Sequence, residues 1–127
     1  MTNNSGIAQD AFKTVYPESD EAPPWRLKII KGYERGRTIP LDASREYTIG
    51  RKDCDITIHQ NDKRASRRHA ILCVQKNKLV IENLSLTTGT LVNGKKVDKI
   101  RLQHDDYIAV GATLFAVEHN KPDISIF

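Results

Sequence analysis

The chain has 127 residues, of which 39% are hydrophobic and 28% charged, and this composition is that of one soluble globular domain. No apolar stretch approaches the roughly 20 residues that cross a bilayer, and the start of the chain lacks the basic and apolar regions of a secretory signal. We therefore expect a cytoplasmic protein with no membrane insertion. The two cysteines, Cys54 and Cys73, form no CxxC pair, and we expect both thiols to be reduced.

Charge is distributed unevenly along the chain. The formal net charge is +4, but residues 1–24 carry −3 and the remaining residues carry +7. Residues 1–24 also lack periodic apolar positions and end in two prolines, Pro23 and Pro24, so we interpret them as a flexible acidic leader. A basic body attracts anions, and the leader is a candidate to visit the same surface.

Short runs rich in branched and aromatic residues follow the leader. Gly, Asn, Asp and Lys separate these runs, and no run has a helical period of apolar residues over ten or more positions. Many short strands with tight turns, such as the type I′ signal Asn93-Gly94, indicate an antiparallel β-sandwich or barrel. The pattern predicts strands at Arg26–Ile30, Arg37–Pro40, Glu46–Gly50, Ile56–Ile58, His69–Val74, Lys78–Asn83, Thr90–Val92, Tyr107–Val110 and Thr113–Glu118.

Side-chain alternation along His69–Val74 separates two faces of that predicted strand. Ala70, Leu72 and Val74 share one face, which we expect in the core, and His69 falls on the other. Trp25 opens the ordered region beside the two prolines, so we expect it to pack the first strand against the core rather than to bind a ligand.

Sequence patterns that mark enzymes and metal sites do not occur. The four histidines have no HxH or HExxH spacing, and neither a P-loop nor a GxGxxG is present. The adjacent carboxylates Asp105 and Asp106 suit a turn better than acid–base catalysis. We therefore expect no enzymatic activity, no cofactor and no metal.

Three separate segments carry groups that suit an oxyanion. Arg51 directly follows a predicted strand, the segment 63–69 (KRASRRH) is basic and contains a serine, and the segment 87–90 (TTGT) supplies hydroxyls. Arginine forks, hydroxyls and backbone amides are the groups that bind phosphate. Loops at one end of a sandwich lie close together, so we expect the three segments to form one pocket at one apex.

These segments resemble the motifs of the forkhead-associated (FHA) domain. The resemblance covers about residues 25–120, followed by a tail at 121–127, and its elements come in the family's order. It implies an all-β fold, an FHA/SMAD-like antiparallel β-sandwich of about eleven short strands whose apical loops bind a phosphothreonine peptide. The matching residues are Gly50-Arg51, Ser66-Arg67-Arg68-His69-Ala70, Asn83-Leu84-Ser85, the run from Thr87 to Gly94, Leu102, Asp106-Tyr107-Ile108 and Gly111.

The resemblance also implies roles for individual residues at the binding site. Arg51 and Ser66 match the family's phosphate-binding arginine and serine. Arg67 resembles the basic residue that flanks the phosphate, and Thr87 matches a hydroxyl donor in the next loop. Thr88 stands where the family usually has an asparagine that bonds the peptide backbone, and threonine offers one hydroxyl in place of a two-donor amide.

Three further residues resemble structural positions of the family. His69 is similar to a histidine that braces the loops from behind, and Asn93 and Gly94 are similar to turn residues. None of the three is expected to contact the ligand.

The leading hypothesis is a non-catalytic adaptor that acts downstream of a Ser/Thr kinase. Its partners would be phosphothreonine-containing proteins, such as the kinase or its substrate, and also its own leader if Thr14 is a regulatory phosphosite. The alternative is a phosphate-independent scaffold that uses a sheet face, for example a subunit of a secretion or signalling assembly. We expect no nucleic-acid binding, because the basic residues are spread over several loops and the aromatic residues lie in predicted core strands.

Overall fold

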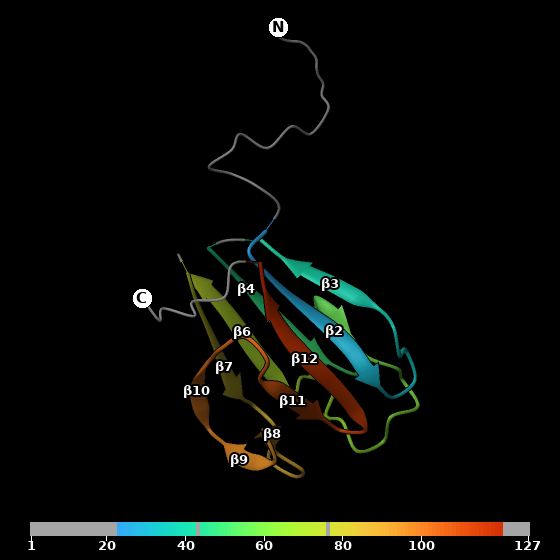
Figure 1. Ribbon diagram of the computed structural model, residues 1–127. Helices are drawn as coiled ribbons and strands as arrows, with labels where there is room; N and C mark the ends of the chain where they lie inside the picture. Colours follow the sequence, from blue (N-terminus) through green and yellow to red (C-terminus); the bar gives the residue numbers. More distant parts are fainter. Residues whose placement is uncertain (1–22, 43, 76, 121–127) are drawn as a thin grey trace, which may run out of the picture.

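The computed structural model describes residues 23–42, 44–75 and 77–120. These residues form eleven strands in two sheets and no helix (Figure 1). One sheet has five strands in the order β10-β7-β6-β4-β5, and the other has six in the order β3-β2-β12-β11-β8-β9. The predicted all-β sandwich is confirmed. Accordingly, no helix in the described ranges is long and apolar enough to span a membrane.

The strand bounds follow the sequence pattern closely. The five-stranded sheet contains β4 (Arg45–Gly50), β5 (Ile56–Thr57), β6 (Ala70–Gln75), β7 (Lys78–Asn83) and β10 (Lys99–Leu102). The six-stranded sheet contains β2 (Trp25–Lys31), β3 (Thr38–Leu41), β8 (Thr90–Val92), β9 (Lys95–Val97), β11 (Tyr107–Val110) and β12 (Thr113–His119). All strands predicted from the runs are present, and β9 and β10 are additional.

Two features of the sheets differ from the sequence prediction. The additional strands β9 and β10 carry lysine and arginine side chains and lie at sheet edges, where charged residues protect the exposed hydrogen-bonding groups. In addition, β4 and β5 pair in parallel, with Ile49 opposite Ile56, whereas the other strand pairs are antiparallel. A run of two residues carries no directional signal, so this pairing was not visible in the sequence.

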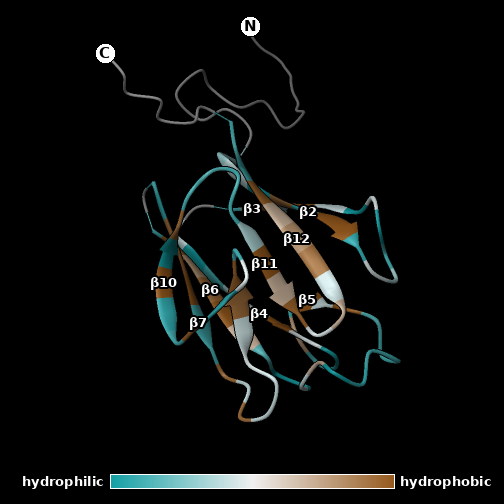
Figure 2. Ribbon diagram, turned by 60° about the horizontal axis from the view of Figure 1, so that its bottom comes forward, coloured by the Kyte–Doolittle hydropathy of each residue, from teal (hydrophilic) through white to brown (hydrophobic). Residues whose placement is uncertain are grey.

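The core lies between the two sheets and is built from alternating positions of each strand. Ala70, Leu72 and Val74 of β6 are buried, as predicted, and they face Phe115 and other inward residues of the six-stranded sheet. Hydrophobic residues follow the strands and hydrophilic residues fill most of the loops (Figure 2). Trp25 is also buried in this core, in agreement with the predicted packing role.

Strand register places the ends of the described chain and the candidate loops at opposite poles of the sandwich. Asn120 N–H donates to the carbonyl of Pro24 at 2.8 Å, so the described ends lie side by side. β2 runs from this pole to the other, where β12 begins, β11 ends and β8 begins. β7 ends and β6 begins at that second pole, and β4 ends beside the start of β6. The loops after β4, before β6 and between β7 and β8 therefore share one apex (Figure 1).

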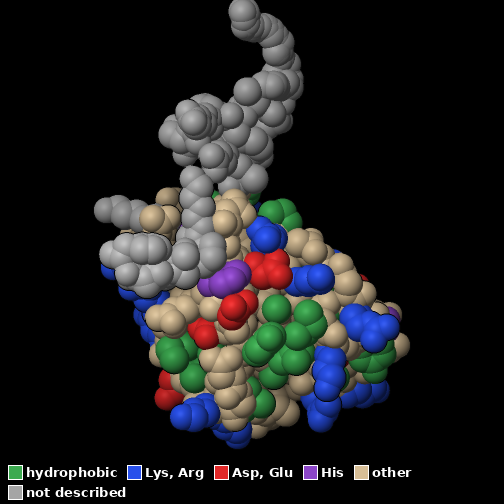
Figure 3. Space-filling model, in the orientation of Figure 1, with side chains coloured by type: hydrophobic (Ala, Val, Ile, Leu, Met, Phe, Trp, Pro, Cys, Tyr) green, Lys and Arg blue, Asp and Glu red, His purple; other side chains and the backbone are tan. Residues whose placement is uncertain are grey.

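The outer face of the six-stranded sheet carries a group of apolar side chains. Ala109 lies opposite Leu114, and Ala116 lies opposite Tyr107, so these residues are neighbours across β11 and β12. Figure 3 shows apolar side chains together near the middle of this face, with lysines and arginines towards its margins. This face is a surface distinct from the apical loops.

Candidate functional site

The apical loops after β4, before β6 and between β7 and β8 are called the first, second and third loop. Backbone hydrogen bonds join the first loop to the second. Arg51 N–H donates to the carbonyl of Ser66 at 3.0 Å, and Lys52 N–H donates to the carbonyl of Arg67 at 3.3 Å. Gly50 permits this approach, because a Cβ at that position would lie 1.9 Å from the carbonyl oxygen of Arg67. The glycine of the predicted Gly50-Arg51 motif thus lets the end of β4 pack directly against the loop that contains Ser66.

His69 connects the second and third apical loops from inside. Ser66 N–H donates to Nδ1 of His69 at 2.9 Å, and Nε2 of the same ring lies 2.8 Å from the carbonyl oxygen of Gly89. Because Nδ1 accepts a hydrogen bond from Ser66 N–H, Nε2 is the ring nitrogen that donates to the Gly89 carbonyl. The sequence pattern placed His69 on the outer face of a strand, which is wrong: His69 precedes β6 and is fully buried.

The hydroxyl of Ser85 organises the third loop. It accepts from the backbone N–H groups of Thr87 and Thr88 at 3.3 Å and of Gly89 at 3.4 Å, and it lies 2.9 Å from the hydroxyl of Ser66. Ser85 is 5% exposed. Its side chain therefore curls the loop around one oxygen and fixes the loop against Ser66.

Arg51, Ser66 and Thr87 are brought to the same apex by these contacts. Arg51 is half-buried, and its Nε donates to the carbonyl of Ala65 at 3.1 Å, which orients the guanidinium along the second loop. Ser66 is half-buried and Thr87 is exposed, and both lie within hydrogen-bond reach of the Ser85 hydroxyl. Arg67 is exposed beside Ser66.

Thr88 links two loops through its side chain. Its hydroxyl donates to the carbonyl of Arg64 at 2.7 Å, which ties the third loop to the second. Thr88 is exposed, and this hydroxyl is its one side-chain donor. The Thr88 hydroxyl, which the motif resemblance placed at the peptide backbone, is therefore already engaged by the Arg64 carbonyl.

The arginine and lysine side chains of the apical loops form no ion pair with an acidic residue. The ion pairs among the described residues are Arg26–Glu118, Arg37–Glu34, Arg45–Asp55 and His104–Asp105, and none of them includes an apical cation. An unpaired basic cluster over rigid hydroxyl-bearing loops attracts a phosphate group. Residues 23–42, 44–75 and 77–120 contain no cluster of histidine, cysteine and acidic side chains that could hold a metal ion.

The cysteines contribute no disulfide to this apex. Cys54 and Cys73 are both free thiols. Cys54 donates through Sγ to the carbonyl of Arg67 at 3.1 Å, and burial raises its pKa above the usual value. Its thiol is therefore protonated at neutral pH and helps to hold the first loop against the second.

Three residues that support or border the site were not predicted as site residues. Ser85 was part of the quoted motif, but the sequence does not show which oxygen the loop amides share. Asp62 is buried and accepts from Ala112 N–H at 2.8 Å, so it joins the second loop to the β11–β12 turn, and no motif marked it. Leu86 is 99% exposed between Ser85 and Thr87, and an apolar side chain so placed is available to a ligand.

The remaining predicted residues lie away from the apex or outside the described residues. Asn93 and Gly94 form the turn between β8 and β9 with φ values of +52° and +84°, and the Asn93 side chain accepts from Tyr107 N–H at 2.9 Å. Thr14 and the rest of the leader to residue 22 lie outside the described residues, as do residues 121–127.

Comparison with known proteins places these loops in a family. The family model for the FHA domain matches residues 47–111, which include all three apical loops. The chain belongs to the FHA family. The resemblance drawn from its motifs is therefore confirmed, and FHA domains are phosphopeptide-binding modules for protein–protein interaction, not enzymes.

Individual relatives agree with this assignment. Nibrin from Danio rerio is 40% identical over 74 residues, which are 58% of this chain and 9% of nibrin, so the chain matches a small part of that relative. The FHA domain of the CT664 protein from Chlamydia trachomatis is 26% identical, with a TM-score of 0.70 over 77% of this chain and 99% of that one. An FHA domain from an analysis of phosphothreonine-dependent FHA domain interactions is 27% identical, with a TM-score of 0.68 over 77% of this chain and 98% of that one.

Proposed function

We propose that this FHA domain binds partner proteins only when a threonine in them is phosphorylated, and so acts as an adaptor downstream of a Ser/Thr kinase in the cytoplasm. The observation that carries the proposal is the convergence of the Arg51 guanidinium and the Ser66 and Thr87 hydroxyls at one apex with unpaired cations. A phosphate at neutral pH carries about −1.5 to −2 charges and forms one to three charge-assisted hydrogen bonds in such a pocket. A similar FHA domain has been analysed for phosphothreonine-dependent interactions, which supports the choice of residue.

Calorimetry with a phosphothreonine peptide and its unphosphorylated twin tests the proposal. The parent should bind the first and not the second. Arg51→Ala and Ser66→Ala should each weaken binding by about 1.5–3 kcal/mol, the range for hydrogen bonds to a charged group. Arg101→Ala, on the exposed edge strand β10, is the matched control and should bind like the parent. Equal binding of both peptides would overturn the proposal.

A phosphate-independent scaffold is the second candidate. The apolar face formed by Ala109, Leu114 and Ala116 favours it, because a sheet face of this kind suits contact with another protein (Figure 3). The two functions predict different variants: Ala116→Glu would abolish scaffold binding and leave phosphopeptide binding intact, whereas Ser66→Ala would have the opposite effect.

Self-regulation through Thr14 remains part of the proposal and has a geometric requirement. Trp25 lies at the pole opposite the apical loops, so a phosphorylated Thr14 must cross a distance set by the seven residues of β2, about 20 Å. The eleven residues from Thr14 to Trp25 span roughly 35 Å when extended, which is sufficient. Tethering would raise the local concentration of the tail to about millimolar.

The test of self-regulation uses protein phosphorylated at Thr14. Amide NMR signals of Arg51, Ser66 and Thr87 should shift on phosphorylation, and the Ser66→Ala variant should show smaller shifts. Unmoved signals at these three residues would exclude self-capture without affecting the proposal on partner proteins.

A further inference from the structure

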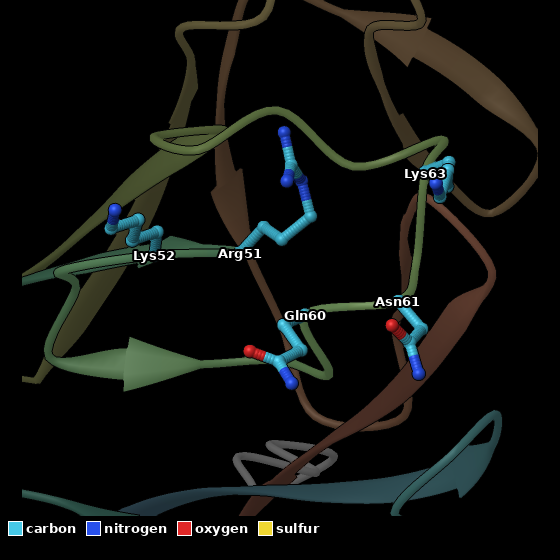
Figure 4. Close-up of a pocket in the computed structure, with 5 residues that line it drawn as sticks. All are labelled: Arg51, Lys52, Gln60, Asn61 and Lys63. Carbon is cyan, nitrogen blue, oxygen red and sulfur yellow. The ribbon is translucent and has the colours of Figure 1, made fainter.

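The apex and the outer face of the six-stranded sheet are surfaces of opposite chemistry. At the apex, Figure 4 shows a hollow that belongs to the candidate phosphopeptide site and is lined by polar side chains: Arg51, Lys52, Gln60, Asn61 and Lys63. The outer sheet face carries apolar side chains near its middle (Figure 3), and the described residues leave these side chains partly exposed. Any group that covers this face must therefore come from outside the described residues.

Two rows of side chains form this apolar outer face. Leu91, Ala109 and Leu114 lie opposite one another across β8, β11 and β12 and form the first row. Tyr107 and Ala116 form the next row across β11 and β12. Tyr107 is 46% exposed, and the other four residues are half-buried. Contiguous apolar side chains on the outside of a fold are typical of a contact site.

Lysines border the apolar outer face on both sides. In the strand register, Lys28 and Lys31 of β2 lie opposite Ala116 and Leu114, and Lys96 of β9 lies opposite Leu91. All three lysines are exposed, and the ion pairs found in the described part of the chain do not include them. A segment that fits this surface should therefore combine an apolar side with acidic residues next to it.

The acidic leader contains such a segment. The leader as a whole has no apolar period, but residues 7–16 (IAQDAFKTVY) are apolar at positions 7, 8, 11, 12, 15 and 16. This spacing places the apolar side chains in one stripe if the segment is helical. Pro17 follows the stripe and marks its end. Residues 17–24 then contribute three carboxylates and no basic side chain before β2 begins.

The leader joins the sheet close to the apolar outer face. It is continuous with β2 at Trp25, and Lys28 lies three residues along that strand, about 10 Å away. Ala116 lies on the neighbouring strand, about 5 Å further. The eight residues 17–24 span up to about 27 Å when extended, so the stripe can reach the face. The tether also raises the local concentration of the stripe to about millimolar.

The C-terminal segment 121–127 (KPDISIF) is the other described chain end near this face, because Asn120 lies beside Pro24. It carries one lysine and one aspartate and so has no net negative charge to match the lysines. It also offers three large apolar side chains, fewer than the stripe of the leader. Charge and apolar content therefore both favour the leader.

We propose that residues 7–16 dock as an amphipathic helix on the apolar outer face of the same chain. Phe12 and Tyr16 lie in the apolar stripe against the two rows, and the carboxylates of residues 17–24 lie near Lys28 and Lys31. A docked leader covers the face that a scaffold function would use, so a partner protein must displace it. The docking does not depend on phosphothreonine binding, which would take place at the apical loops.

Amide NMR spectra of the whole chain test the docking. In the double variant Phe12→Glu/Tyr16→Glu, the signals of the apolar outer face should move, because removal of two aromatic side chains weakens an apolar contact by at least about tenfold. The matched control Gln9→Glu/Ser19→Glu adds the same charge to the leader outside the stripe and should leave these signals in place.

The reciprocal variant places a charge on the sheet. Ala116→Glu should abolish the helical chemical shifts of residues 7–16, since an isolated helix of ten residues is marginal in water. In the parent, the Phe12 ring should show nuclear Overhauser contacts to the methyl groups of Ala109 or Ala116 that do not change with protein concentration.

Several results would overturn the proposal. Face signals that stay in place in Phe12→Glu/Tyr16→Glu, or that move equally in the control, would exclude the apolar stripe as the occupant. Movement of the face signals in Ile124→Glu/Phe127→Glu instead would identify the C-terminal segment. Contacts that strengthen with protein concentration would identify the leader of a second copy. Phosphopeptide binding is measured separately at the apical loops, so none of these results decides the proposed function.

Discussion

Replacement of His69 by alanine should destabilise the domain strongly and loosen the site. The ring is fully buried and makes two hydrogen bonds, to Ser66 N–H and to the carbonyl of Gly89. Each bond contributes about 1 kcal/mol, and the volume left by the ring adds about 1 kcal/mol. The expected loss is therefore about 3 kcal/mol, which for a domain of this size lowers Tm by roughly 15 °C.

Urea unfolding followed by Trp25 fluorescence measures this loss. His104→Ala is the matched control, because that half-buried ring accepts one hydrogen bond, from His119 N–H at 3.0 Å, at the opposite pole. It should cost about 1 kcal/mol and leave phosphopeptide affinity unchanged. His69→Gln keeps one donor and one acceptor and should lose less than His69→Ala. An unfolding free energy of His69→Ala within about 0.5 kcal/mol of the parent would refute the bracing role.

Three further predictions concern the loops and the pH dependence. Ser85→Ala leaves three loop amides without their shared acceptor, and because these bonds are long we expect a loss of about 1–2 kcal/mol in urea unfolding and weaker phosphopeptide binding. Thr88→Val removes the bond to the Arg64 carbonyl and should cost about 0.5–1 kcal/mol, whereas Thr88→Asn, which supplies a second N–H donor, should bind the peptide at least as well as the parent in calorimetry. Hydrogen bonds from the Thr48 backbone and side chain, with Arg45 nearby, lower the pKa of Asp55 below its ordinary 3.8. The stabilising contribution of the Asp55 carboxylate is therefore complete above pH 3.8 and is lost as the pH falls through the pKa of the folded state. Carboxyl NMR titration and melting curves from neutral to acidic pH measure this loss, and the Asp55→Asn variant should not show it.

Local pattern was sufficient for the central strands because each of them has one buried face. The runs that form β6 and β12 are almost continuously apolar, so the existence of both strands was predictable, and side-chain alternation along β6 predicted its inward residues Ala70, Leu72 and Val74. The edge strands β9 and β10 were not, because an edge favours lysine over apolar alternation, and charged runs resemble loops. Their presence depends on pairing with β8 and β7, which no local window contains.

In the candidate site, too, residues in local motifs were easier to predict than residues whose role depends on contacts in the folded structure. Arg51, Ser66 and Thr87 were predictable as candidates, because each lies in a short motif with a fixed order. The support beneath them was less accessible, since the Ser85 hydroxyl gathers amides from its own loop and Asp62 reaches a turn fifty residues away. The inward position of His69 also escaped the period-two rule, because the residue lies in a loop one position before β6.

The most direct test of the phosphate-dependent account is a two-dimensional amide NMR titration of the whole chain with a phosphothreonine peptide and with its unphosphorylated twin. The account predicts that the phosphopeptide shifts the signals of Arg51, Ser66 and Thr87, that Ala116 on the outer sheet face is unaffected, and that the twin shifts none of them. Shifts centred on Ala116, or equal shifts with both peptides, would contradict it.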